Sequence, residues 1–275
     1  MKYLWCYYRN LWLLLFQIIL VLATCASSLS IFQVDGLRSS ELVINSDKNS
    51  LDVKRINAIA EQITVRVLST NTLGSGTIIK RSGNIYTIIT SAHVINGINS
   101  PYTIQTPDGK IYLAEKVSKD NSVKQKKDIV LLQFFSSQAN YSIANIGDIG
   151  KMSIGEDVYA VGFPLRVHDR LGANSSFQLN KSLAFREGKF VILLNKPLMN
   201  GYRLAYTSSV DVGMSGGSVL NSKGEVIGIN GLRDDPIWDI PMQYQDGTEP
   251  SLSIQKLISN SSLAIPIEDI AYVFK

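Results

Sequence analysis

Gly213–Gly217, with the sequence Gly-Met-Ser-Gly-Gly, is the stretch from which the fold and chemistry of this chain can be inferred. A serine hydroxyl becomes a nucleophile when a base takes its proton, and the charge that develops on the attacked carbonyl needs fixed donors. Glycines beside Ser215 let the backbone turn sharply and direct bare N–H groups at that charge. The pattern predicts that Ser215 is a nucleophile; a glycine-rich hairpin turn is the alternative.

The base and its partner come from a small set of residues, because the chain has two histidines, His93 and His168. His93 follows a β-branched run, and Asp128 precedes an apolar run. The order His93, Asp128, Ser215 is that of chymotrypsin-like triads and differs from the order in subtilisin-like and α/β-hydrolase enzymes. Taken singly, His93 could be a hydrogen-bonded strand-end residue and Asp128 a strand cap. His168 lies in a charged, loop-like stretch and is predicted to be a surface residue.

Four further segments extend this pattern: Gly74–Ile79, Thr90–His93, Tyr159–Pro164 and Ala264–Pro266. With them, the chain resembles the trypsin/chymotrypsin-like serine peptidases, in particular a bacterial branch similar to the Deg/HtrA protease domain. The resemblance runs from about Ile63 to the C-terminus. We expect no PDZ domain, since the sequence stops at Lys275.

The resemblance implies an all-β fold of two antiparallel six-stranded β-barrels with a C-terminal helix. We expect the N-terminal barrel within residues 51–150 and the C-terminal barrel with the terminal helix within 151–275, with the boundary near 148–154. The residues themselves agree with an all-β class, because short alternating segments separated by Gly-, Asn-, Asp- and Pro-bearing turns are typical of barrels and sandwiches.

Two helices are predicted at the edges of this β-rich region. Apolar residues recur at helical spacing before the first strand, at Leu51, Val53, Ile56 and Ile59. The final segment, Ile267–Phe274, begins after a proline and carries acidic residues in its first turn, which favours a helix there.

The resemblance also implies the roles of the site residues. Ser215 would be the nucleophile, His93 the general base and then acid, and Asp128 the residue that orients the imidazole. The backbone N–H groups of Gly213 and Ser215 would form the oxyanion hole. The strand Ile229-Asn230-Gly231 would pair with the substrate backbone as an added β-strand.

Three positions depart from patterns known in relatives. Zymogen-type trypsins carry an aspartate just before the serine; here Met214 stands there, so the oxyanion loop must be ordered in another way. Ser209 occupies the position of the trypsin pocket aspartate and is expected to bind substrate, but without a trypsin-like preference for basic residues. Asn230 replaces the histidine of glutamyl endopeptidases. The insertion Arg233–Glu249 either rims the specificity pocket or is a solvated loop.

The N-terminus has the pattern of an export signal. Residues 1–26 combine a positive start, a short apolar core and small residues for cleavage, and residues 27–50 form a flexible lead-in. An uncleaved anchor, or lipidation at Cys25, is the alternative. Cys6 and Cys25, the two cysteines of the chain, both lie here. If cleavage follows Ala26, we expect a mature protein without cysteines and therefore without disulfides. We expect a periplasmic or secreted protein that contacts a membrane only through this segment.

Composition excludes several other functions. The net charge is +4, and no basic run is interleaved with aromatic residues, so nucleic-acid binding is not expected. No Cys/His cluster suggests a metal, and no cofactor is predicted. The favoured function is an exported serine endopeptidase that acts on proteins or peptides. The alternatives are a catalytically silent peptide-binding module and an esterase for small acyl substrates.

Overall fold

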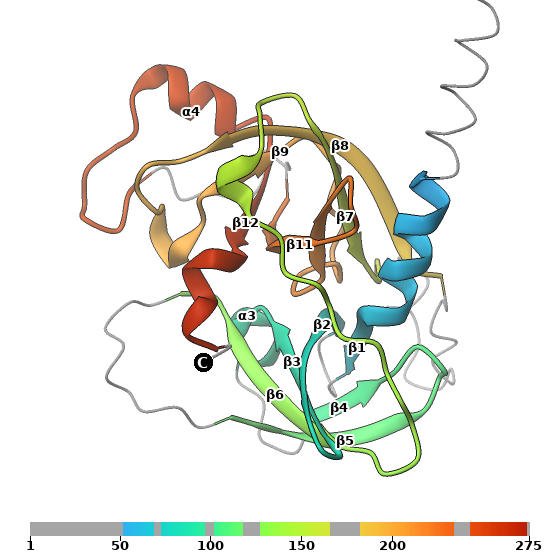
Figure 1. The fold of residues 1–275 in the computed structure, drawn as a ribbon. Helices are drawn as coiled ribbons and strands as arrows, with labels where there is room; N and C mark the ends of the chain where they lie inside the picture. The colour runs from blue at the N-terminus through green and yellow to red at the C-terminus, as the bar shows by residue number, and fades with distance from the viewer. Residues whose placement is uncertain are drawn as a thin grey trace, which may run out of the picture. The chain divides into compact units, whose positions relative to one another are not determined.

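The computed structural model describes residues 52–68, 73–96, 102–117, 127–165, 182–233 and 243–273. These residues form two closed, six-stranded antiparallel β-barrels, which confirms the predicted all-β, chymotrypsin-like fold (Figure 1). The expected leader and lead-in, residues 1–50, lie outside the described residues, as does His168.

The strands of the first barrel are β1 (Thr64–Leu68), β2 (Leu73–Ser82), β3 (Ile85–Thr90), β4 (Tyr102–Gln105), β5 (Ile111–Lys116) and β6 (Val130–Phe135); α3 (Ala92–Ile95) follows β3. They are hydrogen-bonded in the order β1-β2-β3-β6-β5-β4. The β2–β3 hairpin turns at Gly83, whose φ of +60° suits the first position of a two-residue hairpin turn. Alternate residues of each strand point inward and form one apolar core.

The second barrel has the order β10-β11-β12-β9-β8-β7 and its own core. Residues 136–156 connect the barrels and include the expected boundary. The strands are β7 (Asp157–Gly162), β8 (Ala184–Leu193), β9 (Leu204–Tyr206), β10 (Ser218–Asn221), β11 (Val226–Leu232) and β12 (Ser262–Pro266). The short helices of this half are η1 (Ile149–Lys151), η3 (Met199–Gly201), α4 (Leu252–Ile258) and η4 (Ile267–Val273).

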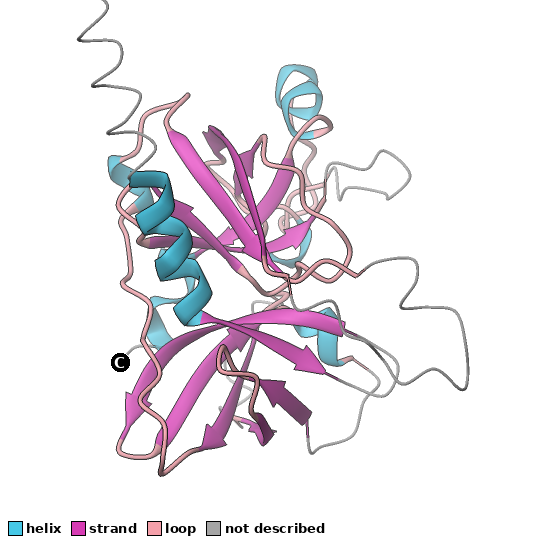
Figure 2. Cartoon of the chain, turned by 90° about the vertical axis from the view of Figure 1, so that its right-hand side faces the viewer, coloured by secondary structure: helices cyan, strands magenta, loops and turns pink. Residues whose placement is uncertain are grey.

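Helical residues 52–63 lead directly into β1, as the spacing of apolar residues predicts (Figure 2). Their buried side chains, with Ile56 and Ile63 among them, belong to a core cluster that also contains side chains of both barrels. The terminal helix is present as the 3-10 helix η4, with a non-helical φ of −121° at Ile270. Its residues Ile267 and Ile270 are fully buried in the same cluster, whereas Phe274 lies outside the described residues.

Within the described ranges, no helix is both long and apolar enough to cross a membrane.

Candidate active site

Asp128 and His93 meet because of the register of two neighbouring strands. Thr90 at the end of β3 pairs with Val130 at the start of β6, so the residues just beyond these ends lie side by side. The Asp128 carboxylate accepts hydrogen bonds from the His93 backbone N–H, at 2.8 Å, and from His93 Nδ1, at 2.5 Å. The carboxylate side chain is 10% exposed and the imidazole 44% exposed. The Asp128 carboxylate is therefore largely shielded from solvent, while the imidazole remains accessible to it.

The contact with Asp128 also determines the tautomer of His93. A carboxylate accepts hydrogen bonds, so the proton of the neutral imidazole lies on Nδ1. Nε2 is then the ring atom with a lone pair, and it is the atom that can take a proton from a hydroxyl.

Ser215 lies in the loop between β9 and β10 and is fastened to the first barrel by its backbone. Its carbonyl accepts from Ser75 N–H of β2 at 2.9 Å. The next residue, Gly216, has φ +86°, and a Cβ there would lie 2.2 Å from Thr90 Oγ1 and 2.9 Å from Ser91 N. Thr90 and Ser91 immediately precede the helix that carries His93, so the loop of Ser215 packs against the segment leading into that helix.

The Ser215 hydroxyl donates to the carbonyl oxygen of Gly231, over 3.3 Å. A hydrogen bond from Ser215 to His93 is not among the contacts of the described residues. Hydrogen bonds between catalytic groups are often long in ligand-free proteins and tighten when substrate binds.

The backbone around Gly213 leaves the N–H groups of Gly213 and Ser215 without an acceptor among the described residues. The Val212 carbonyl accepts from Leu165 N–H at 2.6 Å, and the Met214 carbonyl accepts from Gly217 N–H at 3.0 Å. A trans peptide directs its C=O and its N–H in opposite directions. The N–H groups of Gly213 and Ser215 therefore point away from Leu165 and Gly217, the donors to the carbonyls of the same two peptides. Neither of the two N–H groups donates to an acceptor within the described residues.

The loop Gly213–Gly217, in which the oxyanion hole is expected, is held by contacts other than an aspartate. Met214 is fully buried in the core of the second barrel. Ser75 Oγ accepts from Phe163 N–H and donates to the Gly213 carbonyl, each at 2.8 Å. A hydroxyl of the first barrel thus connects this loop to the end of β7, and together with the buried Met214 it orders the loop without an aspartate.

The four residues expected to bind substrate lie in different environments. Ile229 is packed in the shared core, and Ser209 is exposed. Asn230 is fully buried; its side chain donates to the Val161 carbonyl and accepts from Tyr206, and its backbone bonds Gly216 and Gly217. Pairing with β12 shifts register between Asn230 and Leu232. Of the strand 229–231, the Gly231 carbonyl is therefore the group directed at Ser215.

Two functional candidates were not predicted from the sequence. Tyr202 donates from its hydroxyl to Asp128 Oδ2 at 2.5 Å, and Ser75 supports the oxyanion loop. No local motif marks Tyr202, since it lies 74 residues from Asp128 along the chain. Ser75 belongs to the Gly-Ser-Gly segment, although nothing in that segment reveals the acceptor.

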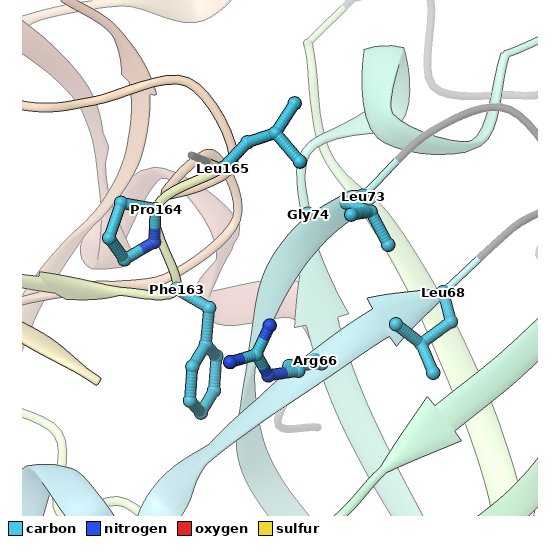
Figure 3. A pocket seen from close by; sticks show the side chains of 7 residues that line it. All are labelled: Arg66, Leu68, Leu73, Gly74, Phe163, Pro164 and Leu165. Carbon is cyan, nitrogen blue, oxygen red and sulfur yellow. The ribbon is translucent and has the colours of Figure 1, made fainter. Parts of the chain in front are cut away.

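A small pocket lies beside the oxyanion loop, where β1 and β2 face the end of β7 (Figure 3). The Arg66 guanidinium lies over the Phe163 ring, 4.2 Å from its centre. Leu165, whose N–H holds the Val212 carbonyl, is part of the same wall.

Of the insertion Arg233–Glu249, the structure describes Arg233 and the residues from 243 onward. Its Gln243 carbonyl accepts from Met199 N–H, and Gln245 N–H donates to the Pro197 carbonyl. Lys196 forms an ion pair with Asp246 at 2.7 Å. This part of the insertion therefore packs on the connection between β8 and β9. Residues 234–242 lie outside the described residues. The expectation that the insertion rims the specificity pocket concerns these residues as well.

Comparison with known proteins gives consistent results. A family model described as "Trypsin-like peptidase domain" matches residues 74–229. Curated proteins named "Serine protease HtrA-like", from Staphylococcus aureus strains USA300 and NCTC 8325, are 26% identical over 212 residues, which is 75% of this chain and 24% of each relative. The chain thus spans about a quarter of their length. A solved structure, the serine endoprotease from Yersinia pestis, shares the fold, with TM-score 0.54 and 23% identity over 81% of this chain and 65% of that one.

Proposed function

Since this chain belongs to the family of trypsin-like, serine-type peptidase domains, we propose that it cleaves proteins or peptides with Ser215, His93 and Asp128 as its catalytic triad. The observation that supports this most is the hydrogen bond between His93 Nδ1 and the solvent-shielded Asp128 carboxylate. The backbone of Ser215 is held in addition by a hydrogen bond from Ser75 N–H. The pairing with Asp128 leaves Nε2 as the ring nitrogen with a lone pair, and the loop of Ser215 packs against the segment that leads into the helix of His93.

The proposed reaction follows from these positions. His93 Nε2 takes the proton of Ser215 Oγ as the oxygen attacks the scissile carbonyl, and Asp128 stabilises the resulting imidazolium. The N–H groups of Gly213 and Ser215 donate to the oxyanion. His93 then protonates the leaving amine, which departs from the acyl-enzyme. Water, deprotonated by the same nitrogen, hydrolyses the ester and frees Ser215.

The substrate would bind beside Gly231. The Gly231 carbonyl is directed at Ser215, whereas the hydrogen-bonding groups of Asn230 are already used within the barrel. We place the substrate-pairing edge at Gly231, with Ile229 and Asn230 supporting it from behind. Ser209 remains the candidate for the pocket that receives the side chain before the scissile bond.

The test is labelling by a fluorophosphonate probe, which reacts with activated serines, followed by peptide mapping of the labelled residue. The label is expected on Ser215. Ser222, exposed in the turn after β10, is the internal control and should stay unlabelled. A label spread over several serines, or none at all, would contradict the proposed mechanism.

The alternative is a peptide-binding module that does not cut. It is favoured by one observation, the hydrogen bond from Ser215 to Gly231 in place of one to His93. Retained binding of an extended peptide, without labelling and without cleavage, would support this alternative. Cleavage of a simple ester but of no peptide amide would instead indicate an esterase.

We also propose export of the chain, with residues 1–26 as a cleaved leader. The proposal rests on the positive start and the short apolar core of that segment. Mass spectrometry of the mature N-terminus distinguishes cleavage from retention and from lipidation at Cys25.

Ser75→Ala is expected to lower kcat about 3- to 10-fold while KM stays unchanged, because it removes the hydroxyl that holds the Gly213 carbonyl. Steady-state kinetics on a peptide amide measure this effect. Thr77→Val is the matched control on the same strand, since the buried Thr77 hydroxyl makes no hydrogen bond within the described residues. Equal kinetics for both variants would show that the Ser75 hydroxyl does not support catalysis.

A further inference from the structure

Asp128 of the first barrel is held by hydrogen bonds with a short segment of the second barrel, Asn200–Tyr202. We call this segment the Asp128 clip. The Asn200 carbonyl accepts from Asp128 N–H at 2.9 Å, and the Tyr202 hydroxyl donates to Asp128 Oδ2. Between them, a Cβ on Gly201 would lie 3.0 Å from Lys127 Cγ. The clip thus contacts both the backbone and the side chain of Asp128.

The backbone of the clip is unusual. Asn200 has φ +64°, the one positive φ at a residue other than glycine in the described ranges, and Gly201 has φ +93°. Such left-handed conformations cost energy at a non-glycine residue and persist only where the surroundings enforce them. Here the surroundings include Leu198 N–H, which donates to the Tyr202 carbonyl, and the Gln243 carbonyl, which accepts from Met199 N–H.

The ring of Tyr202 fills space that a side chain at position 231 would otherwise occupy. Tyr202 is 1% exposed. A Cβ on Gly231 would lie 2.2 Å from Tyr202 Cε1 and 2.4 Å from its hydroxyl oxygen. The absence of a side chain at Gly231 therefore allows the Tyr202 phenol, from the connection before β9, to reach the carboxylate.

The Tyr202 hydroxyl and His93 Nδ1 share one acceptor, Asp128 Oδ2, each at 2.5 Å. Burial, reinforced by the negative charge of Asp128, raises the pKa of Tyr202 far above its usual value, so the phenol keeps its proton. Tyr206 is the further ionisable neighbour that raises this pKa. Lys127, which lies beside Gly201, directs its ammonium at the Asp269 carbonyl. The phenol is thus a permanent donor to the oxygen that faces the imidazole.

We propose that Tyr202 is a positioning residue of the peptidase: it fixes the Asp128 carboxylate so that Oδ2 faces His93, and it withdraws negative charge from that oxygen. The proposal rests on the proposed function for its kinetic consequences. The geometry that it explains, a shared acceptor and a clip that bridges two barrels, does not depend on turnover.

Tyr202→Phe tests the proposal, because it keeps the ring over Gly231 and removes the hydroxyl. A hydrogen bond to a charged group is lost, so kcat is expected to fall about 10- to 100-fold with KM unchanged. Oδ2 then carries more charge and stabilises the imidazolium, so the acid limb of the kcat/KM profile is expected to move to higher pH.

The matched control is Tyr86→Phe, since Tyr86 is an equally buried tyrosine whose hydroxyl donates to the Ala139 carbonyl in the first barrel. It should lose similar stability with unchanged kcat and pH profile. In an Asp128→Ala background, Tyr202→Phe should have no further effect on kcat, whereas a merely structural role would lower it in both backgrounds.

A readout independent of turnover separates failure of this inference from failure of the proposed function. The proton NMR signal of His93 Nδ1–H reports its hydrogen bond to Asp128, and it is expected to shift in Tyr202→Phe and to stay in Tyr86→Phe. A shift without peptide cleavage by the wild type would uphold the positioning role and reject the peptidase. Cleavage with kcat, pH profile and NMR signal all unchanged in Tyr202→Phe would overturn the positioning role.

Discussion

Ser215→Ala is expected to lower kcat for peptide hydrolysis about a million-fold, with His93→Ala causing a loss of similar size. The reason is that in the proposed mechanism the two side chains act in one step, in which the imidazole takes the proton as the hydroxyl oxygen attacks. Without either partner, the proposed oxyanion donors, the N–H groups of Gly213 and Ser215, would still bind the substrate carbonyl, so a small residual rate is expected.

The double variant sharpens this prediction. Groups that act as a unit are not additive, so Ser215→Ala combined with His93→Ala should be no slower than either single variant. Ser222→Ala is the control, with wild-type kinetics expected. Independent, multiplying losses would mean that Ser215 and His93 do not exchange a proton, and the proposed triad would have to be abandoned.

Gly216→Ala is expected to reduce the free energy of unfolding by about 2–5 kcal/mol, as the sum of a left-handed backbone and overpacking. Gly216 has φ +86°, and a Cβ there would lie 2.2 Å from both the Ser75 carbonyl oxygen and Thr90 Oγ1. Denaturant unfolding measures the loss, and activity should fall with it, since the same contact seats the loop of Ser215.

Gly109→Ala separates the two contributions. Gly109 has φ +82°, but no atom lies within 4 Å of the place that a Cβ would take, so only the backbone cost of about 1–2 kcal/mol applies. Equal losses at the two glycines would show that the contact between Gly216 and the first barrel is loose and does not seat Ser215.

The parts of the site that could be predicted from sequence are those controlled by local order. His93 ends a β-branched run and Asp128 begins an apolar one, and the pairing of these strands brings the two residues together. The same holds for the barrels, because turns and alternating segments recur along the chain. The glycines around Ser215 were informative because close packing excludes any side chain at Gly216.

The remaining parts depend on contacts between distant segments. Nothing near Tyr202 in the sequence indicates that its hydroxyl reaches Asp128 in the other barrel. Asn230 looked available to substrate, but hydrogen bonds to Val161 and Gly217 occupy it, and these form only once the barrel closes. Likewise, the acceptor of the Ser75 hydroxyl is fixed by the path of the oxyanion loop.

The apolar cluster that takes side chains from helical residues 52–63, from both barrels and from η4 ties the stability of each half to the other. Neither half can melt without exposing to water side chains on which its neighbour depends, and residues 51–275 form one compact unit. Denaturation should therefore be a single cooperative transition, without a species in which one half survives alone. The residues of the proposed triad, which are divided between the two halves, would then be lost together, and no partly folded form would keep His93 without Ser215.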